Sequence, residues 1–387
     1  MTDIALESII ENCRSRMADV SYSAIRDFKS THPTSRIIGC FPVYTPVELY
    51  DAVGALPLGL FGAEGRVEIV HADARFQSFV CSIARSTLEM LLQNKWDFLD
   101  GIVFHSICDV ARNLASVVKR NCPKLYVEFI HFPQNTASVT SLNYYISELT
   151  RLRKHLEELT GRPFRDEALR EAIHKRNLIR REINQLHKIR RETPHLISTS
   201  ELYAILRAGA LMLPDEYYNT LKQVVAGVSQ RTRKPKDHIR VIIEGAFCEQ
   251  PPVDLINVIE EAGCDIVDDD FILGWQWFKE ELHVDGKPME TLARAYIENS
   301  PPSSVRHCDR QPREAELVKR VRQSKADAVI FTPAKFCEPA LFDYVPFKMA
   351  LEKEGIPHLV VEFEEKMWTF ERIRNEVETF VESMLFD

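Results

Sequence analysis

The residues in this chain that are best suited to redox or metal chemistry are its nine cysteines. Their number is odd, and no two of them form a CxxC pair or show the clustered spacing of a disulfide framework. In a reducing compartment, such thiols are metal ligands, nucleophiles or small buried apolar residues. The nine positions are Cys13, Cys40, Cys81, Cys108, Cys122, Cys248, Cys264, Cys308 and Cys337.

Three of these cysteines are predicted to lie where a sheet would bind a ligand. Cys108 follows a strand predicted at 101–105, and Cys337 follows the matching strand of the second half, so both lie at carboxyl ends of strands. Cys81 lies near the start of a helix predicted at 78–92, where the positive helix end favours a thiolate. Three thiolates from two domains can hold an iron-sulfur cluster. The alternative for each cysteine is a place in the apolar core.

Alternating strands and helices position these residues. In the first half, strands are predicted at 36–41, 56–61, 101–105 and 124–130, and helices after Thr45 and at 78–92 and 109–119. In the second half, strands are predicted at 239–243, 265–267, 328–331 and 359–363, with helices from about 314, after 338 and at the C-terminus. This alternation predicts an α/β fold in which each half has a doubly wound parallel sheet.

The middle of the chain follows a different pattern. From about 142 to 191, apolar residues recur at helical spacing within long charged segments, which predicts a helical insertion. The basic stretch at 231–236 indicates a linker. We therefore predict an N-terminal α/β domain at 1–140, a helical bridge at 141–230 and a C-terminal α/β domain at 231–387.

The two halves also resemble each other. Residues 101–129 and residues 328–363 each contain a strand, a cysteine loop, a helix, a proline and a strand that ends in Val-Glu-Phe. The repeated order predicts two related domains. Because ligands of such sheets bind beyond the carboxyl ends of the strands, Cys108 and Cys337 are expected to face each other across a cleft between the domains.

Other side chains near the predicted strand ends allow more than one interpretation. Cys40 follows the first strand and is either a neighbour of the site or a core residue. His105 could donate a hydrogen bond or a proton near Cys108, and the alternative is a satisfied core histidine. Glu48, three residues after Thr45, is most simply a capping-box glutamate, and the alternative is a side chain that faces the cluster.

Clusters of charged and aromatic residues are predicted to be structural. The carboxylates at 268–270 are adjacent and cannot all converge on one ion, which favours a solvated loop. The aromatic residues within 275–278 could wall a substrate pocket, but core packing is the simpler interpretation. Solvated faces are also the simpler interpretation of the basic residues that could meet ligand phosphates, namely Lys175, Arg176, Arg180, Arg181, Arg231, Arg233, Lys234 and Lys236.

Charge and composition exclude several functional classes. The chain has 387 residues and a formal net charge of -8, which argues against a nucleic-acid binder. It contains no apolar run long enough to span a membrane and no apolar signal segment at its start, so we expect a soluble, cytoplasmic protein. It also contains no GxxxxGK[ST] phosphate loop and no GxGxxG dinucleotide motif.

Four segments resemble the benzoyl-CoA reductase and 2-hydroxyacyl-CoA dehydratase subunit family. They are YTPVELYDAVGALPLGL at 44–60, ADARFQSFVCSIARSTLE at 72–89, SICD at 106–109 and FCEPALFD at 336–343. Nearly the whole chain fits the layout of that family. Its length and the run that begins at Cys81 are most similar to the smaller active-site subunits of ATP-dependent benzoyl-CoA reductases.

The resemblance implies a cofactor and a set of partners. Cys81, Cys108 and Cys337 match the family's ligands to a 4Fe-4S cluster, which stands alone or forms part of a larger bridged cluster. The implied partners are a homologous larger active-site subunit, electron-activating subunits that hydrolyse ATP, ferredoxin as electron donor and a coenzyme A thioester as substrate. The expected reaction is the reductive dearomatisation of benzoyl-CoA to cyclohexadienoyl-CoA in anaerobic catabolism. The alternatives are the smaller subunit of a 2-hydroxyacyl-CoA dehydratase, which is a lyase, and a non-catalytic electron-relay subunit.

Overall fold

The first half of the chain folds around a four-stranded parallel sheet. The computed structural model describes residues 3–245, 249–271, 278, 280–304, 306 and 312–386. The strands pair in the order β2-β1-β3-β4, and each pair is parallel. They are β1 (Arg36–Cys40), β2 (Ala55–Gly59), β3 (Gly101–His105) and β4 (Tyr126–Ile130).

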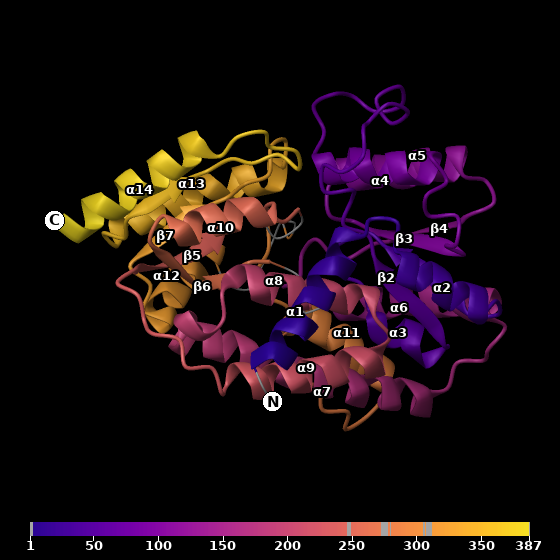
Figure 1. Cartoon of the computed structure of the whole chain (residues 1–387). Coiled ribbons are helices and arrows are strands. Elements are labelled where there is room, and N and C mark those ends of the chain that lie inside the picture. Colours follow the sequence, from indigo (N-terminus) through magenta and orange to yellow (C-terminus); the bar gives the residue numbers. More distant parts are fainter. Residues whose placement is uncertain are drawn as a thin grey trace.

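A second parallel sheet in the other half repeats this order as β6-β5-β7-β8. Figure 1 shows the first sheet in purple on the right and the second in orange and yellow on the left. The two sheets confirm the predicted fold class, and their matching strand orders agree with the predicted repeat. The strands are β5 (Ile239–Glu244), β6 (Cys264–Asp269), β7 (Ala328–Phe331) and β8 (His358–Val360).

Helices pack on both sheets because the strands are apolar on both faces. Every residue of β2 and β3 is buried, as expected for a parallel sheet that is covered on each side. The first sheet carries α2 (Ser23–Thr31), α3 (Val47–Ala52), α4 (Ser82–Leu92) and α5 (Asp109–Asn121), and the second carries α10 (Val253–Glu261), α12 (Arg313–Ser324), α13 (Glu338–Lys353) and α14 (Glu371–Phe386). No helix in these described ranges is long and apolar enough to cross a bilayer.

Two helices of the middle segment, α7 and α9, lie below both sheets in Figure 1. Two helices from outside this segment join them, because α1 packs on α8 and α9, and α11 packs on α6 and α7. The domain boundaries proposed from the sequence therefore stay a prediction. The group comprises α1 (Asp3–Ala18), α6 (Ser141–Thr160), α7 (Asp166–Glu192), α8 (Thr199–Ala208), α9 (Pro214–Val228) and α11 (Pro288–Glu298), with short 3-10 turns at Pro194–Leu196 and Gly209–Leu211.

The long helix α7 connects the two domains through buried ion pairs. Toward the first sheet, Arg176 Nε lies 2.6 Å from an Asp51 carboxylate oxygen of α3, and Arg180 pairs with Glu48 one turn away. Toward the second sheet, Arg190 Nη1 lies 2.5 Å from an Asp269 oxygen at the end of β6. One rigid helix therefore holds groups of both domains at a set separation.

This network corrects the interpretation of Glu48. The helix α3 begins at Val47 without a side-chain cap, and the Glu48 side chain is fully buried against Arg180 rather than folded back on the backbone. The capping-box interpretation was wrong. Because α3 packs against α7, Glu48 lies against the buried Arg180, and a buried guanidinium without a carboxylate partner costs more free energy than an uncapped helix amide.

We expect Arg180→Met to lower the free energy of unfolding by about 3 kcal/mol, because it leaves the Glu48 carboxylate buried without a partner. The double variant Arg180→Met/Glu48→Gln should recover part of that loss, since no buried charge then remains. The adjacent Arg181→Met is the control, because Arg181 pairs with Glu281 at the surface and such pairs contribute at most about 1 kcal/mol. Urea unfolding measures all three, and equal losses for Arg180→Met and Arg181→Met would contradict this account.

Candidate functional site at three helix N-termini

Three cysteines occupy the same local position in three different helices. Cys81 immediately precedes α4, Cys108 precedes α5 and Cys337 precedes α13, so each is the N-cap residue of its helix. Serine, threonine and aspartate normally hold this position, because their oxygens accept hydrogen bonds from free helix amides. A thiolate at the same place is stabilised by those amides and by the positive end of the helix.

Each cysteine is followed three residues later by an alanine, in the runs Cys-Ser-Ile-Ala, Cys-Asp-Val-Ala and Cys-Glu-Pro-Ala. The Cys108 sulfur accepts a hydrogen bond of 3.5 Å from the Ala111 amide. The Ala84 amide likewise lowers the pKa of Cys81, and the Ala340 amide lowers that of Cys337, so both favour the thiolate. The local repeat thus supplies one backbone donor to each sulfur, and a small side chain at the third helical position leaves the sulfur room.

The strand ends place these cysteines on the same side of the two sheets. Cys108 follows β3 by three residues, and Ser106 fixes this connection by accepting a hydrogen bond of 2.8 Å from the Phe132 amide. Cys337 follows β7, and its amide donates to Ala334 at 3.0 Å, next to the isolated bridge between Ala334 and Phe363. In Figure 1, the helices α4, α5 and α13 all lie above their sheets.

The three thiols are close enough to affect one another's ionisation. Burial raises the pKa of Cys81 well above its usual value, and Glu249, Cys108 and Cys337 raise it further. Burial likewise raises the pKa of Cys108, and it raises the pKa of Cys337 to about 12. Without a bound cation the thiols are therefore protonated, and a metal centre would have to displace these protons.

The other cysteines that the structure describes lie away from this group. Cys40, for which the sequence left two interpretations open, is fully buried in the core, and burial raises its pKa to about 12. Cys122 ends α5 at the opposite end of that helix from Cys108. Cys248 and Cys308 lie outside the described residues.

His105 is a core residue of β3, in keeping with the structural interpretation. It is fully buried, and burial lowers its pKa to about 3, so the imidazole is neutral. Neither ring nitrogen makes a hydrogen bond of good geometry among the residues that the structure describes, but the Phe41 backbone lies close enough to raise the pKa slightly against the effect of burial.

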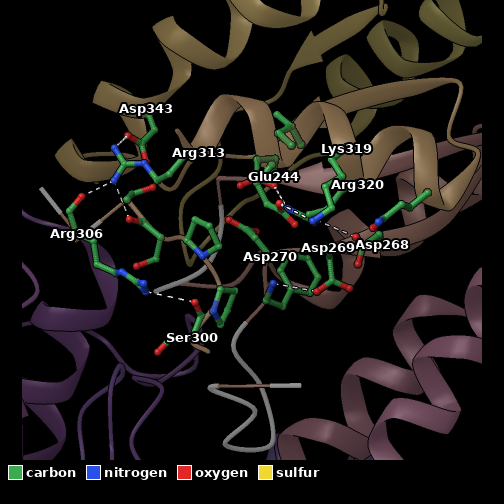
Figure 2. A pocket seen from close by; sticks show the side chains of 18 of the residues that line it. Glu244, Asp268, Asp269, Asp270, Ser300, Arg306, Arg313, Lys319, Arg320 and Asp343 are labelled. Atoms are coloured by element: carbon green, nitrogen blue, oxygen red, sulfur yellow. Dashed lines mark hydrogen bonds and ion pairs between the residues drawn. The ribbon is translucent and has the colours of Figure 1, made fainter. Parts of the chain in front are cut away.

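The three adjacent aspartates were wrongly interpreted as a solvated loop. Asp268 and Asp269 belong to β6, and Asp268 accepts from Arg320 Nε at 2.9 Å. Asp270 accepts from the Gly245 amide at 2.9 Å. Figure 2 shows Asp268 joined to Arg320 at the wall of a cavity, and Asp269 pairs with Arg190 of α7, so the aspartates belong to a charge network at the carboxyl end of the second sheet.

Solvated faces were the wrong interpretation for three of the basic residues, because Arg176, Arg180 and Arg231 are buried in ion pairs. Arg231 is buried, and its guanidinium binds Glu201 and Glu7 at 2.5 to 3.1 Å. Phe278 packs edge-on against Tyr296 beneath the guanidinium of Arg180. The neighbouring tryptophans, Trp275 and Trp277, lie outside the described residues.

Sequence reasoning missed two acidic residues, of which Glu249 is near enough to raise the pKa of Cys81 and Cys337. Glu249 is buried, and burial together with Glu365 raises its pKa to about 8. Burial also raises the pKa of Glu365 to about 7. Both residues come from irregular segments with no motif, so only the folded chain brings them to the site.

A comparison with protein families places this arrangement in a known group. The sequence profile described as "2-hydroxyglutaryl-CoA dehydratase, D-component" matches residues 42–384. The chain belongs to this family. The resemblance drawn from the four sequence segments is thereby confirmed.

Relatives within this dehydratase family include both reductase and dehydratase subunits. A benzoyl-CoA reductase subunit of Thauera aromatica is 35% identical to this chain over 97% of its length and 98% of the relative. The (R)-phenyllactyl-CoA dehydratase beta subunit of Clostridium sporogenes is 27% identical over 90% of this chain and 92% of the relative. The lactoyl-CoA dehydratase subunit beta of Anaerotignum propionicum is 26% identical over 97% of this chain and 100% of the relative. Family membership therefore supports a subunit of an enzyme.

In this member of the dehydratase family, a buried glutamate holds the loop that leads to Cys81. Glu89 of α4 accepts hydrogen bonds of 2.8 to 3.1 Å from the amides of residues 70–72, and it also binds the His71 ring and the Gln93 amide group. Burial opposes ionisation of Glu89, but these donors outweigh it and lower its pKa to about 2. The loop is thus fastened to the same helix whose N-terminus carries Cys81.

Glu89→Gln should lower the free energy of unfolding by about 2 to 3 kcal/mol at neutral pH, because charge-assisted hydrogen bonds are lost. The wild-type carboxylate has a lower pKa folded than unfolded, so its contribution is present above its usual pKa of 4.5 and disappears as the pH falls toward 2. Urea unfolding at several pH values should therefore show the difference between the two proteins shrinking in acid. The exposed Glu290→Gln is the control, and a difference that does not change with pH would contradict the role of charge.

Proposed function

We propose that this chain is the iron-sulfur subunit of an ATP-dependent benzoyl-CoA reductase, which reduces the aromatic ring of benzoyl-CoA to a cyclohexadienoyl-CoA. The observation that carries the proposal is the identity of 35% with the Thauera aromatica reductase subunit over nearly the full length of both chains, against 26 to 27% for two dehydratase subunits. The three N-cap thiols supply the kind of ligand that the reaction needs.

The donor set fits a 4Fe-4S cluster held by Cys81, Cys108 and Cys337. Sulfur ligands select iron-sulfur centres, and the helix amides offset the negative charge that such a centre brings. The described residues contain no group of three side chains spaced to hold a single metal ion. This absence is compatible with a cluster, alone or within a larger bridged assembly, because each cysteine of a cluster binds a different iron and the sulfurs stand further apart.

The residues of this chain would prepare the site in three ways. The N-cap geometry holds the sulfurs at one place, packing against the apolar core limits their contact with water, and the helix ends make the thiolate form accessible. A bound cluster supplies one-electron transfer at low potential. If these three cysteines held such a cluster, one iron would lack a cysteine ligand from this chain.

We also propose that the chain works within a larger complex. It carries no phosphate-loop motif of its own, so ATP hydrolysis would fall to separate electron-activating subunits, with ferredoxin as the electron donor. The relatives are named as subunits, which supports a homologous larger partner that shares the coenzyme A thioester substrate.

The ligand assignment predicts the metal content of single variants. Cys81→Ser, Cys108→Ser and Cys337→Ser should each lose most of the iron and acid-labile sulfide of the anaerobically purified protein, because a hydroxyl is a poor ligand for iron in a cluster. Cys122→Ser is the matched control and should keep both, since Cys122 lies at the far end of α5. Unaltered iron in all three ligand variants would overturn the assignment.

A second function is favoured by the family profile and by the dehydratase relatives, namely the smaller subunit of a 2-hydroxyacyl-CoA dehydratase. The complex assembled with its partners should reduce benzoyl-CoA anaerobically and consume ATP in proportion to the product. A dehydratase would instead release water from a 2-hydroxyacyl-CoA and return its electron, so ATP would be needed only to start turnover. Product analysis with both substrates distinguishes the two functions.

A further inference from the structure

The helix α13 of the second half is apolar on both of its faces. Its inner face packs on the second sheet, where Phe347 and Leu351 belong to the same buried cluster as Phe331 of β7. Its outer face is exposed, and the large side chains there are also apolar, namely Leu341 (41% exposed), Phe342 (77%), Val345 (58%) and Met349 (66%). Steps of three and four residues place these four side chains in one stripe. A helix that is apolar all round is normally covered on both sides.

The matching helix of the first half shows that the fold itself does not require an apolar outer face. Like α13, α5 follows the third strand of its sheet and has a cysteine as its N-cap residue. Counted from the two cysteines, the places of the four apolar residues are taken in α5 by exposed polar residues, namely Arg112, Asn113, Ser116 and Arg120. The stripe on α13 therefore indicates a contact with another protein surface.

The size of the stripe suits a weak contact rather than a permanent one. Its four side chains expose on the order of 400 Å² of apolar surface, taking roughly 150 to 200 Å² for a fully exposed large apolar side chain. Two such stripes against each other would bury about 800 Å², and polar neighbours add a rim. Stable interfaces usually bury about 1,200 to 2,000 Å² in total, so a contact through this helix lies at the weak end.

Charged residues at the two ends of the stripe are complementary to each other. Glu338 is the first residue of α13 and Lys353 is the last, and both are exposed. Neither side chain has an ion-pair partner among the residues that the structure describes. Their spacing from Phe342 and Met349 is four residues in each case, so the acid and the base lie on the same side of the helix as the apolar stripe.

A two-fold axis beside Val345 satisfies the apolar and the charged groups together. An antiparallel pair of α13 helices that sets Glu338 opposite Lys353 of a second copy also sets Phe342 opposite Met349, because both pairs are centred between residues 345 and 346. Each contact then occurs twice. A thioether against an aromatic ring is a favourable contact, and antiparallel helix dipoles attract each other.

We propose that the outer face of α13 is a contact between two copies of this chain, which form a weak two-fold dimer through antiparallel α13 helices. The self-complementary order of acid, apolar stripe and base along one helix selects a second copy over an unrelated partner. The proposal goes beyond the proposed function and depends on neither the cluster nor the substrate.

The association of the full-length chain with itself tests the proposal. Sedimentation equilibrium of the anaerobically purified protein should show monomers and dimers with a dissociation constant in the range of about 10 to 100 µM. Phe342→Asn and Val345→Ser introduce the residues of the matching α5 positions and should each raise this constant about tenfold or more. Val139→Ser is the matched control, because Val139 is 95% exposed but lies outside α13, and it should change the constant less than about twofold.

A charge exchange tests whether the two faces are identical. Lys353→Glu and Glu338→Lys should each raise the dissociation constant about fivefold, because like charges then meet at both ends of the helix pair. The double variant Glu338→Lys/Lys353→Glu should return to within about twofold of the original constant, since opposite charges meet again. Only a contact between copies of the same face gives this recovery. Cooperative urea unfolding and unchanged iron content show that each variant is folded.

Three results would overturn the proposal. The first is a monomer at every concentration up to about 200 µM. The second is the same dissociation constant for Phe342→Asn, Val139→Ser and the unmodified chain. The third is a monomer that binds the homologous larger subunit and loses this binding in Phe342→Asn, which would assign the face to that subunit. Iron content and product analysis judge the proposed function separately.

Discussion

The site depends on one constraint of parallel sheets: a strand followed by a helix places the helix N-terminus at the carboxyl edge of the sheet. This chain applies the constraint in both halves and puts a cysteine at the N-cap of the helix after β3 and of the helix after β7. A third cysteine caps α4, which lies beside α5. Three positive helix ends are thus directed at sulfur atoms that influence one another, although they come from distant parts of the sequence.

Burial and helix ends act on these sulfurs in opposite directions. Burial raises the pKa of every one of the three thiols, while a backbone amide at each helix start lowers it. The Glu249 carboxylate raises the pKa of Cys81 and Cys337 further, and burial together with Glu365 raises the pKa of Glu249 itself. Such a site holds protons until a cationic centre replaces them.

The separation of the two sheets is set by α7. Its 27 residues carry arginines that pair with Asp51 and Glu48 of the first domain and with Asp269 of the second. Because these pairs are buried and bidentate or backed by neighbouring contacts, they resist sliding of one domain against the other. The convergence of the three cysteines therefore relies on charged residues that take no part in the chemistry.

The amino-acid sequence by itself determined the local structure. The strands β3 and β7, the helix starts after Cys108 and Cys337, the repeated order of features along the two halves and the family followed from apolar runs and short motifs, which lie within short stretches of the chain. A capping box between Ser198 and Glu201 starts α8, and it depends on only four consecutive residues.

Only the tertiary structure decided the roles of residues whose partners are far away. The sequence predicted a capping role for Glu48, but in the structure Glu48 pairs with Arg180, which lies 132 residues away in α7. The sequence also predicted solvated aspartates at 268–270, but Asp268 and Asp269 pair with arginines of two other helices. No sequence motif indicated a role for Glu249. The physical reason is the same in each case: the charge state of a buried carboxyl group depends on which distant groups remove it from water, and local spacing carries no record of that.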